Sequence, residues 1–326
     1  MNNFNNLSII VKTFFRPDML ERFLQSTSDY QKQHSIRFAE VLIGDDSDDE
    51  TIRKNASVVH NFPDINTNYQ TYEFNIGSGD GRNRLLKEVK TPYFLYCDDD
   101  FILDNRCDID SAINILEKDD LDILGGWLED EYKLETGKYS ERAFIAKFME
   151  ADDTLMMDVN EFYIPNFAYT DCMMNFFIAK TDSVKTFGWD SEMKTQEHYL
   201  FFYQAFKHNL KMAVCRDLFA KHTQHNANKT YDKYRENINK DEFVSKMAIK
   251  TGFDKLIISY FKKNGAVRWS INGKKKTSEV ERFYKKDSGK SHTFFSFKSI
   301  RRWLIRIRWR KDQKIIRLFG IYIINK

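Results

Sequence analysis

The stretch from Asn75 to Asp100 limits the possible folds of this chain more than any other part of the sequence. It reads NIGSGDGRNRLLKEVKTPYFLYCDDD, which predicts a glycine-rich turn, a short helix over Arg82–Val89 and an apolar strand over Tyr93–Cys97. Three aspartates, Asp98 to Asp100, follow that strand directly. Because unpaired charges are costly to bury, a buried strand that ends in clustered acids must place them at a sheet edge that faces solvent or a ligand.

Hard oxygen ligands side by side suit Mg²⁺ or Mn²⁺, and these ions commonly bridge diphosphates. The alternative is a solvated acidic turn, but the glycine turn and Arg82 just upstream favour a metal–diphosphate site. Arg82 lies at an expected helix start, where a guanidinium and free backbone N–H groups both attract phosphate oxygens. Gly79 and its neighbours Gly77 and Gly81 permit close backbone approach. A salt bridge on the helix surface is the alternative for Arg82.

Strands and helices alternate along the first part of the chain. Apolar runs predict strands at Leu7–Lys12, Phe38–Ile43 and Tyr72–Phe74, and Pro17 opens an amphipathic helix after the first strand. This alternation is typical of an α/β fold with a mainly parallel central sheet, whose ligands bind beyond the carboxyl ends of the strands. Four polar features should therefore meet at one edge: Thr13, Asp45 with Asp46, the glycine turn, and Asp98–Asp100.

The second part of the chain predicts a more mixed structure, and residues 226–296 give no clear assignment. Glu129–Asp158 is expected to form an antiparallel excursion with turns. Strands are also expected at Asp122–Trp127, Asn175–Lys180 and Met212–Cys215. A helix is expected at Gln196–His208.

Composition indicates a folded protein, since 42% of the 326 residues are hydrophobic. The beginning of the sequence has no basic segment followed by a long apolar one, so no signal peptide is expected, and no apolar window is long enough to predict a transmembrane helix. The four cysteines show no CxxC spacing. Reduced thiols in a cytoplasmic protein are the simplest interpretation.

The last thirty residues differ in charge from the rest. Residues 297–326 contain ten Lys or Arg and one Asp, a charge of about +9, which leaves about −6 for residues 1–296 of an overall +3. Ile300, Trp303, Leu304 and Ile307 recur at helical spacing, so a basic amphipathic helix on an anionic membrane surface is expected. The alternatives are a helix packed on the rest of the protein and a nucleic-acid-binding arm; an acidic body without a recognition motif argues against the latter.

The order of the motifs resembles that of a known enzyme family. Over roughly residues 6–225 the chain contains, in order, KTFFR, GDDSDDE, NIGSGDGRN, TPYFLYCDDD, GGW, NFFIAKT, KTQEHYLFF and VCRDLFAKH. This set resembles inverting glycosyltransferases of the A-type fold, and more narrowly the β-1,4-N-acetylgalactosaminyltransferases and bacterial capsule and lipopolysaccharide glycosyltransferases. The resemblance implies an α/β, Rossmann-like fold, here with a basic helical tail.

The resemblance also implies a metal site at the DxD-type motif. Asp100 is expected to bind Mn²⁺ (or Mg²⁺) directly, Asp98 to act as a further ligand or ribose contact, and His222 to complete the coordination. A histidine ligand favours manganese. The alternatives are a surface histidine at position 222 and a solvated Asp99.

For the catalytic base the resemblance points to Glu197, at the start of the predicted helix. An inverting transfer needs one group to remove the proton of the acceptor hydroxyl as its oxygen attacks the anomeric carbon. The alternative for Glu197 is stabilisation of the helix dipole. Asp171 is the reserve candidate, and His198 would point about 100° away from Glu197 on a helix, so the two could not share the role.

The remaining site residues are assigned by their places at strand ends. The donor nucleotide is expected to contact Thr13, Arg16, Asp45, Asp46, Gly79, Arg82 and Asp98. Gly126 and Trp127 could form a platform for the sugar, although Trp127 as an ordinary core residue is an equal alternative.

These observations predict a metal-dependent inverting glycosyltransferase. It would move a hexosamine or hexose (GalNAc, GlcNAc or Gal) from a UDP-sugar to a glycan or lipid-linked glycan of lipopolysaccharide or capsule, as a peripheral protein at the cytoplasmic face of the membrane. Residues 1–250 would form the catalytic domain, with a nucleotide-sugar half at about 1–127 and an acceptor half at about 128–250. Residues 251–326 would form a basic extension.

Two other functions stay open. A nucleotidyltransferase shares such sheets and paired acids, but it requires a basic signature in a first glycine loop, and no glycine run follows Lys12. A glycan-binding protein could keep this fold without turnover, although Asp98, Asp100, Glu197 and His222 are all present. No nucleic acid partner is expected, and the oligomeric state is not predicted.

Overall fold

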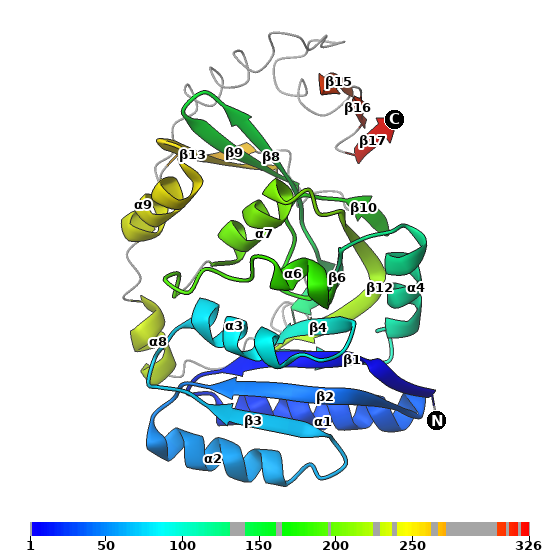
Figure 1. Ribbon diagram of the computed structural model, residues 1–326, viewed down its shortest axis with the longest axis vertical. Coiled ribbons are helices and arrows are strands. Elements are labelled where there is room, and N and C mark those ends of the chain that lie inside the picture. Colours follow the sequence, from blue (N-terminus) through cyan, green and yellow to red (C-terminus); the bar gives the residue numbers. More distant parts are fainter. Residues whose placement is uncertain are drawn as a thin grey trace.

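The computed structural model describes residues 2–130, 141–160, 165–194, 197–223, 229–236, 240–261, 267–271, 305–310, 313–318 and 321–325 (Figure 1). Its first part alternates strands and helices as expected. These are β1 (Asn2–Thr13), α1 (Pro17–His34), β2 (Ile36–Asp45), α2 (Asp49–His60), β3 (Thr67–Thr71), α3 (Ser78–Glu88) and β4 (Tyr93–Asp98).

The middle of the chain adds the other half of the central sheet. Its elements are β5 (Phe101–Leu103), α4 (Ile109–Lys118), β6 (Ile123–Asp130), β7 (Glu141–Arg142), β8 (Ile145–Ala151), β9 (Thr154–Asn160), β10 (Phe167–Tyr169), β11 (Phe177–Lys180), α6 (Thr181–Lys185), α7 (Glu197–Lys207) and β12 (Met212–His222). They are followed by α8 (Lys229–Glu236), α9 (Lys240–Thr251), β13 (Lys255–Phe261), β14 (Val267–Ile271), β15 (Ile305–Arg310), β16 (Gln313–Leu318) and β17 (Ile321–Asn325).

The central sheet has the strand order β10-β12-β6-β11-β4-β1-β2-β3. Strands β4, β1, β2 and β3 are parallel neighbours, β6 is parallel to β12, and β11 runs antiparallel between β4 and β6. The chain proceeds outward from β1 to β3 and then returns to place β4 on the other side of β1. The carboxyl ends of β1 and β4 therefore form the topological switch point at which ligands of such sheets bind.

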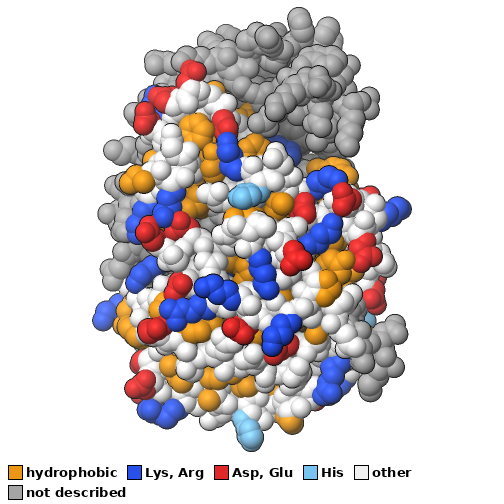
Figure 2. Space-filling model, in the orientation of Figure 1, with side chains coloured by type: hydrophobic (Ala, Val, Ile, Leu, Met, Phe, Trp, Pro, Cys, Tyr) orange, Lys and Arg blue, Asp and Glu red, His pale blue; other side chains and the backbone are white. Residues whose placement is uncertain are grey.

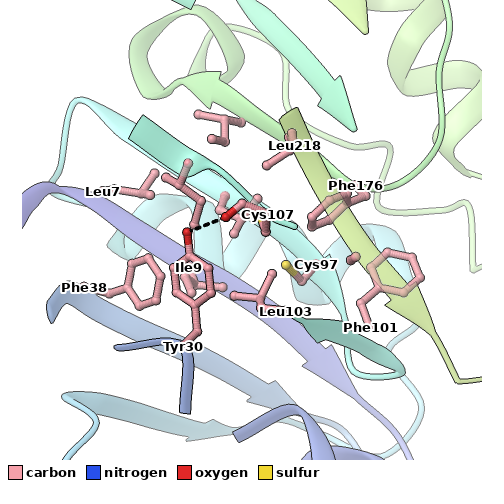
Figure 3. Packing of buried hydrophobic residues seen from close by; sticks show 14 of the residues in the cluster. Leu7, Ile9, Tyr30, Phe38, Cys97, Phe101, Leu103, Cys107, Phe176 and Leu218 are labelled. Carbon is pink, nitrogen blue, oxygen red and sulfur yellow. Dashed lines mark hydrogen bonds between the residues drawn. The ribbon is translucent and has the colours of Figure 1, made fainter. Parts of the chain in front are cut away.

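Helices on both faces explain why the strands are apolar at nearly every position. In β1, Leu7, Ile9 and Val11 belong to one hydrophobic cluster and Ile10 to the other. Figure 3 shows the first cluster, in which Tyr30 of α1 donates a hydrogen bond to the Cys107 carbonyl oxygen at 2.9 Å. A strand buried on both faces loses the polar alternation of a half-exposed one.

A second sheet has the order β14-β13-β9-β8, in which β13 lies parallel to β9. Leu256 and Ile257 of β13 are buried, together with Met247 of α9. This sheet joins β8 and β9 to β13 and β14, so segments on both sides of the boundary expected at residue 250 share one sheet.

Two predicted elements need correction. The third strand lies at Thr67–Thr71, not at Tyr72–Phe74, because the polar edge segment pairs with β2 while Phe74 is 50% exposed. Helix α3 begins at Ser78, not near Arg82. Gly77 precedes the helix with a φ of 95°, a backbone conformation that favours glycine, so the following glycines lie inside the first turn.

The helix predicted for the basic tail is wrong over its described part, since Ile305–Arg310 form strand β15. Isoleucine or tryptophan alternates strictly with arginine over these six residues, and a period of two is the strand pattern. Strands β15, β16 and β17 pair antiparallel in a third sheet. Ile300, Trp303 and Leu304 lie outside the described residues.

The structure can be compared with the expectations for the cysteines and for transmembrane helices. Cys97, Cys107, Cys172 and Cys215 are all buried free thiols. Within the described ranges, no helix is both long enough and apolar enough to cross a membrane.

Candidate functional site

The three aspartates at the end of β4 pair with two arginines from elsewhere in the chain. Arg16 Nη1 donates to Asp100 Oδ2 at 2.8 Å, and its Nη2 contacts Asp99 Oδ1. Arg82 Nη2 donates to Asp98 Oδ1 at 3.1 Å, an oxygen that also accepts the Tyr96 hydroxyl at 2.5 Å. Asp99 is fully buried, so its interpretation as a solvated residue is wrong.

Arg82 also links this acidic edge to the second half of the fold. Its Nη1 contacts Glu197 Oε1, and Glu197 is the first residue of α7. Both residues are buried, with 5% and 3% of their surfaces exposed. The guanidinium lies 4.7 Å from the centre of the Tyr96 ring. One arginine thus holds a carboxylate of the predicted metal motif and the predicted catalytic base.

His222 reaches the same edge from the end of β12. Its Nε2 lies 3.8 Å from Asp100 Oδ2, and its Nδ1 lies 2.7 Å from Asp130 Oδ1 at the end of β6. Nδ1 also lies 3.2 Å from Arg142 Nη2, so it faces both the acceptor Asp130 and the donor Arg142. Arg142 in turn donates to Asp130 Oδ2 at 2.7 Å. The structure therefore brings Asp98, Asp100, Glu197 and His222 together through Arg16 and Arg82.

The charges of the cluster shift the pKa values of its members. Burial and the neighbouring Asp100 charge raise the pKa of Asp99 to about 7, although Arg16 opposes the shift. Burial acts in the same direction on Asp100, but Arg16 and His222 outweigh it and hold the pKa of Asp100 below its usual value. Burial lowers the pKa of His222, yet the nearby carboxylates of Asp100 and Asp130 raise that pKa overall. Asp100 is thus the ionised acid of the adjacent pair.

Four buried polar atoms at this edge have no hydrogen-bond partner: Thr13 Oγ1, Arg16 Nε, Arg82 Nε and Asp99 Oδ2. Buried polar groups are normally paired, so a cluster of unpaired ones indicates a place where a polar ligand binds. In the described part of the chain, no three His, Cys, Asp or Glu side chains are close enough to hold a metal by themselves. Asp100 Oδ2 and His222 Nε2 lie 3.8 Å apart, and a carboxylate and an imidazole at this spacing suit a divalent cation that takes its other ligands from a diphosphate.

Asp45 and Asp46, expected to contact the nucleotide, have their oxygens occupied by the protein. Asp45 accepts the Ser47 N–H at 2.9 Å, the Asn55 side chain at 2.7 Å and the Tyr69 hydroxyl at 2.5 Å. Asp46 contacts the Lys12 ammonium and accepts the Gly77 N–H at 3.1 Å. These carboxylates therefore fix the loop after β2 and the glycine turn before α3.

Two predicted ligand glycines serve helix and strand packing. A Cβ at Gly79 would overlap the Asp190 carbonyl oxygen, so α3 lies directly against that backbone. A Cβ at Gly126 would lie 2.5 Å from the Leu218 carbonyl oxygen. Both glycines permit close approach, as predicted, but the neighbour is protein.

Trp127 and Asp171 are not brought to the acidic edge. Trp127 is 5% exposed and packs with Ala143 and Phe219, which agrees with the core alternative. Asp171 accepts the Lys147 ammonium at 2.7 Å and the Phe148 N–H at 3.1 Å. It lies beside the first residue of β12, since Thr170 N–H donates to the Met212 carbonyl oxygen, whereas His222 is at the other end of that strand.

Several residues of the site were missed from the sequence. Lys12 is buried next to Asp46, and burial lowers the pKa of its ammonium. The sequence feature that could have identified Lys12 is a lysine inside an apolar strand. Asp130 was missed because β6 runs three residues beyond the predicted end at Trp127. Helix α8 lies in the unassigned region, and its Tyr231 ring lies 4.5 Å from the Arg16 guanidinium.

A mainly parallel sheet with polar side chains at its switch point is typical of nucleotide-binding α/β folds. The model of the family "Glycosyl transferase family 2" matches residues 8–181, more than half of the chain, so the chain belongs to glycosyl transferase family 2. This confirms the family resemblance and the fold class.

Relatives agree with this assignment. The chain is 28% identical to mouse (Mus musculus) beta-1,4 N-acetylgalactosaminyltransferase 2 over 248 residues, which cover 72% of this chain and 44% of that protein. It is 27% identical to the human (Homo sapiens) beta-1,4 N-acetylgalactosaminyltransferase 1 over 223 residues, covering 66% and 38%. The chain thus spans less than half the length of these relatives.

The fold is also shared with a solved enzyme. The crystal structure of S. aureus TarS 1–349 in complex with UDP-GlcNAc matches with a TM-score of 0.54 and 18% identity. The match covers 75% of this chain and 65% of that one. At this identity the likeness extends to the fold alone.

Proposed function

We propose that this chain is a metal-dependent, inverting glycosyltransferase that uses a UDP-sugar. The observation that carries the proposal is the link made by Arg82 between Asp98 and Glu197, at the edge where Asp100 and His222 also meet. In this proposal the donor-diphosphate site and the proton-accepting carboxylate would belong to one buried network.

The donor would lie across the carboxyl ends of β1 and β4. Thr13, Arg16 and Arg82 have unpaired buried polar atoms there that suit phosphate oxygens. Asp100, His222 and Asp98 would hold Mn²⁺ or Mg²⁺. When bound, this ion supplies Lewis-acid stabilisation of the departing diphosphate.

Glu197 would accept the proton of the acceptor hydroxyl. Its contact with Arg82 fixes the carboxylate at the first residue of α7. The adjacent His198 is less suited, because burial and the Arg82 charge lower its pKa to about 3, far from neutral pH. Asp171 is held by β8 residues and is the weaker candidate.

The donor sugar is proposed from the relatives. Their names state transfer of N-acetylgalactosamine in a β-1,4 linkage, and the TarS crystal structure is a complex with UDP-GlcNAc. UDP-GalNAc and UDP-GlcNAc are therefore the first donors to test, followed by UDP-Gal. The acceptor would be a bacterial lipopolysaccharide, capsule or lipid-linked glycan.

We further propose a peripheral location at the cytoplasmic face of the membrane, based on the charge of about +9 in residues 297–326. Figure 2 shows one face of the molecule, on which the described Lys and Arg side chains are interspersed with Asp and Glu. Mixed charges on this face give little attraction to anionic lipid, so the basic segment would have to supply it.

A panel of UDP-sugars with acceptor oligosaccharides tests the proposal. UDP should be released with only one of the donors, and its release should require Mn²⁺ and stop when EDTA is added. The sugar product should have an inverted anomeric configuration, as measured by NMR. Pyrophosphate release would instead indicate a nucleotidyltransferase. Glycan binding without any UDP release would indicate a binding protein.

A further inference from the structure

Arg16 is placed by an unusual backbone conformation at the end of β1. Phe15 has a φ of 55°, in the left-handed region that a bulky residue rarely adopts. Its N–H donates to Ser47 Oγ at 2.8 Å. Such a conformation persists only where surrounding contacts determine it. The turn places Arg16 directly before α1, with its side chain over the aspartates.

The guanidinium of Arg16 is enclosed from both sides. Asp99 and Asp100 accept from its two terminal nitrogens, and the Tyr231 ring of α8 lies 4.5 Å away. Its side chain is 15% exposed. Arg16 Nε and Asp99 Oδ2 nevertheless lack partners. The arginine is therefore well held but not fully satisfied, which leaves room for a different arrangement of the same groups.

Arg16 and His222 both face the same oxygen, Asp100 Oδ2. It accepts from Arg16 at 2.8 Å and also faces His222 Nε2 at 3.8 Å. A divalent ion bound by Asp100 and His222 would come close to the Arg16 cation, and like charges at such distances repel strongly in a buried site. Arg16 and the metal therefore compete for one oxygen.

We propose that Arg16 is an internal counter-ion that must leave Asp100 when a divalent metal binds, and that Asp99 keeps it anchored during this exchange. The inference rests on the metal site of the proposed function. It assigns a role to the middle aspartate of the motif, which has one oxygen on Arg16 and the other unpaired. Arg16 would then be free to contact a diphosphate.

One consequence is a coupling between metal and nucleotide. If metal binding releases Arg16 to the diphosphate, UDP should tighten Mn²⁺ binding, and Mn²⁺ should tighten UDP binding by the same factor. Removing Arg16 should raise the intrinsic Mn²⁺ affinity and weaken that coupling, because the competitor and the phosphate contact disappear together.

The test is a titration of Mn²⁺ binding by EPR on the full chain, with and without UDP. Arg16→Gln should bind Mn²⁺ at least about tenfold more tightly than the unchanged protein when UDP is absent, equivalent to ~1.4 kcal/mol. UDP should then increase Mn²⁺ affinity less than it does in the unchanged protein. The matched control is Arg106→Gln, because Arg106 also pairs with several acids, namely Asp104, Glu129 and Glu141. This control should bind Mn²⁺ like the unchanged protein.

Arg16→Lys provides the second variant should Arg16→Gln not fold, as judged by circular dichroism. A lysine keeps the charge but lacks the fork that spans two carboxylates, so Mn²⁺ should bind more tightly than in the unchanged protein and less tightly than in Arg16→Gln. If the folded Arg16 variants bind Mn²⁺ as tightly as the unchanged protein or more weakly, this inference is wrong, but the proposed function is not affected. If the unchanged protein transfers sugar without binding Mn²⁺, the metal part of the proposed function fails as well.

Discussion

Arg82 and Glu197 form a buried ion pair between α3 and α7, although 115 residues separate them in the sequence. With Asp98 on its other nitrogen, Arg82 joins the end of β4 to the start of the helix that carries the predicted base. Neither charge has much access to water, so each depends on the other. If Glu197 is the base, as proposed, stability and activity depend on the same pair.

Replacing Arg82 alone should destabilise the fold by about 3–5 kcal/mol, because Glu197 would be left as an unpaired buried charge. The double variant Arg82→Met with Glu197→Met should recover much of this loss but remain inactive, since an apolar pair removes both charges. Urea denaturation measures the two free energies of unfolding. A double variant that is less stable than Arg82→Met would show that the pair is not an isolated electrostatic unit.

Glu197→Gln should reduce turnover by about 10²-fold or more, because the amide cannot accept a proton. Binding of UDP should change far less, which separates a catalytic role from misfolding. Turnover and UDP affinity are measured on the same preparation. The neighbouring variant His198→Asn is the control and should keep most of its activity. If His198→Asn is the inactive one, or if Asp171→Asn is, the base has been assigned to the wrong residue.

Asp130→Asn should weaken Mn²⁺ binding by about 10–100-fold although Asp130 is not proposed as a ligand. Its carboxylate orients His222 through Nδ1, and loss of such an orienting partner typically has this effect on metal affinity. Asp100→Asn, which removes a proposed ligand, should abolish Mn²⁺-dependent transfer. Asp104→Asn, which disturbs only the Arg106 pairs and the contact with Lys221, is the control. Unchanged Mn²⁺ affinity in Asp130→Asn would count against the orienting role.

Two glycines of α3 should respond differently to alanine. At Gly79 a Cβ would overlap the backbone oxygen of Asp190, so Gly79→Ala should cost about 1–3 kcal/mol of stability as an overpacked position. At Gly81 a Cβ would lie 2.6 Å from Lys12 Cε, a side-chain atom that can move. Gly81→Ala should therefore be milder in thermal unfolding. The reverse order of melting temperatures would contradict this packing.

The basic segment should give reversible binding to anionic vesicles that weakens with salt, because screening shortens the reach of each charge. Truncation after residue 296 should abolish sedimentation with such vesicles and leave transfer to a small soluble acceptor intact. Neutral vesicles serve as the control. Equal sedimentation of both forms, or unfolding of the truncated one, would remove the membrane proposal.

Local sequence determined the alternation of elements and the identity of the acidic edge. The strand before Asp98–Asp100 was predicted because a continuous apolar run ended in charges, and the fold class followed from parallel strands joined by helices. The family could be recognised because these motifs keep their order. Where the local pattern allowed two periods, as at Ile305–Arg310, the helix prediction was wrong.

The tertiary structure alone decided which partners the polar groups at the strand ends have. The local sequence does not distinguish Asp45 and Asp46 from Asp98 and Asp100, because their partners come from other elements. Asp46 contacts Lys12, Asp45 accepts from Tyr69, and Asp98 accepts from Arg82. The same holds for Glu197, which only the packing of α7 against α3 brings to Arg82. Charge and hydrophobicity along the chain predict where polar groups cluster, but the pairing of buried charges depends on distances that only the assembled fold creates.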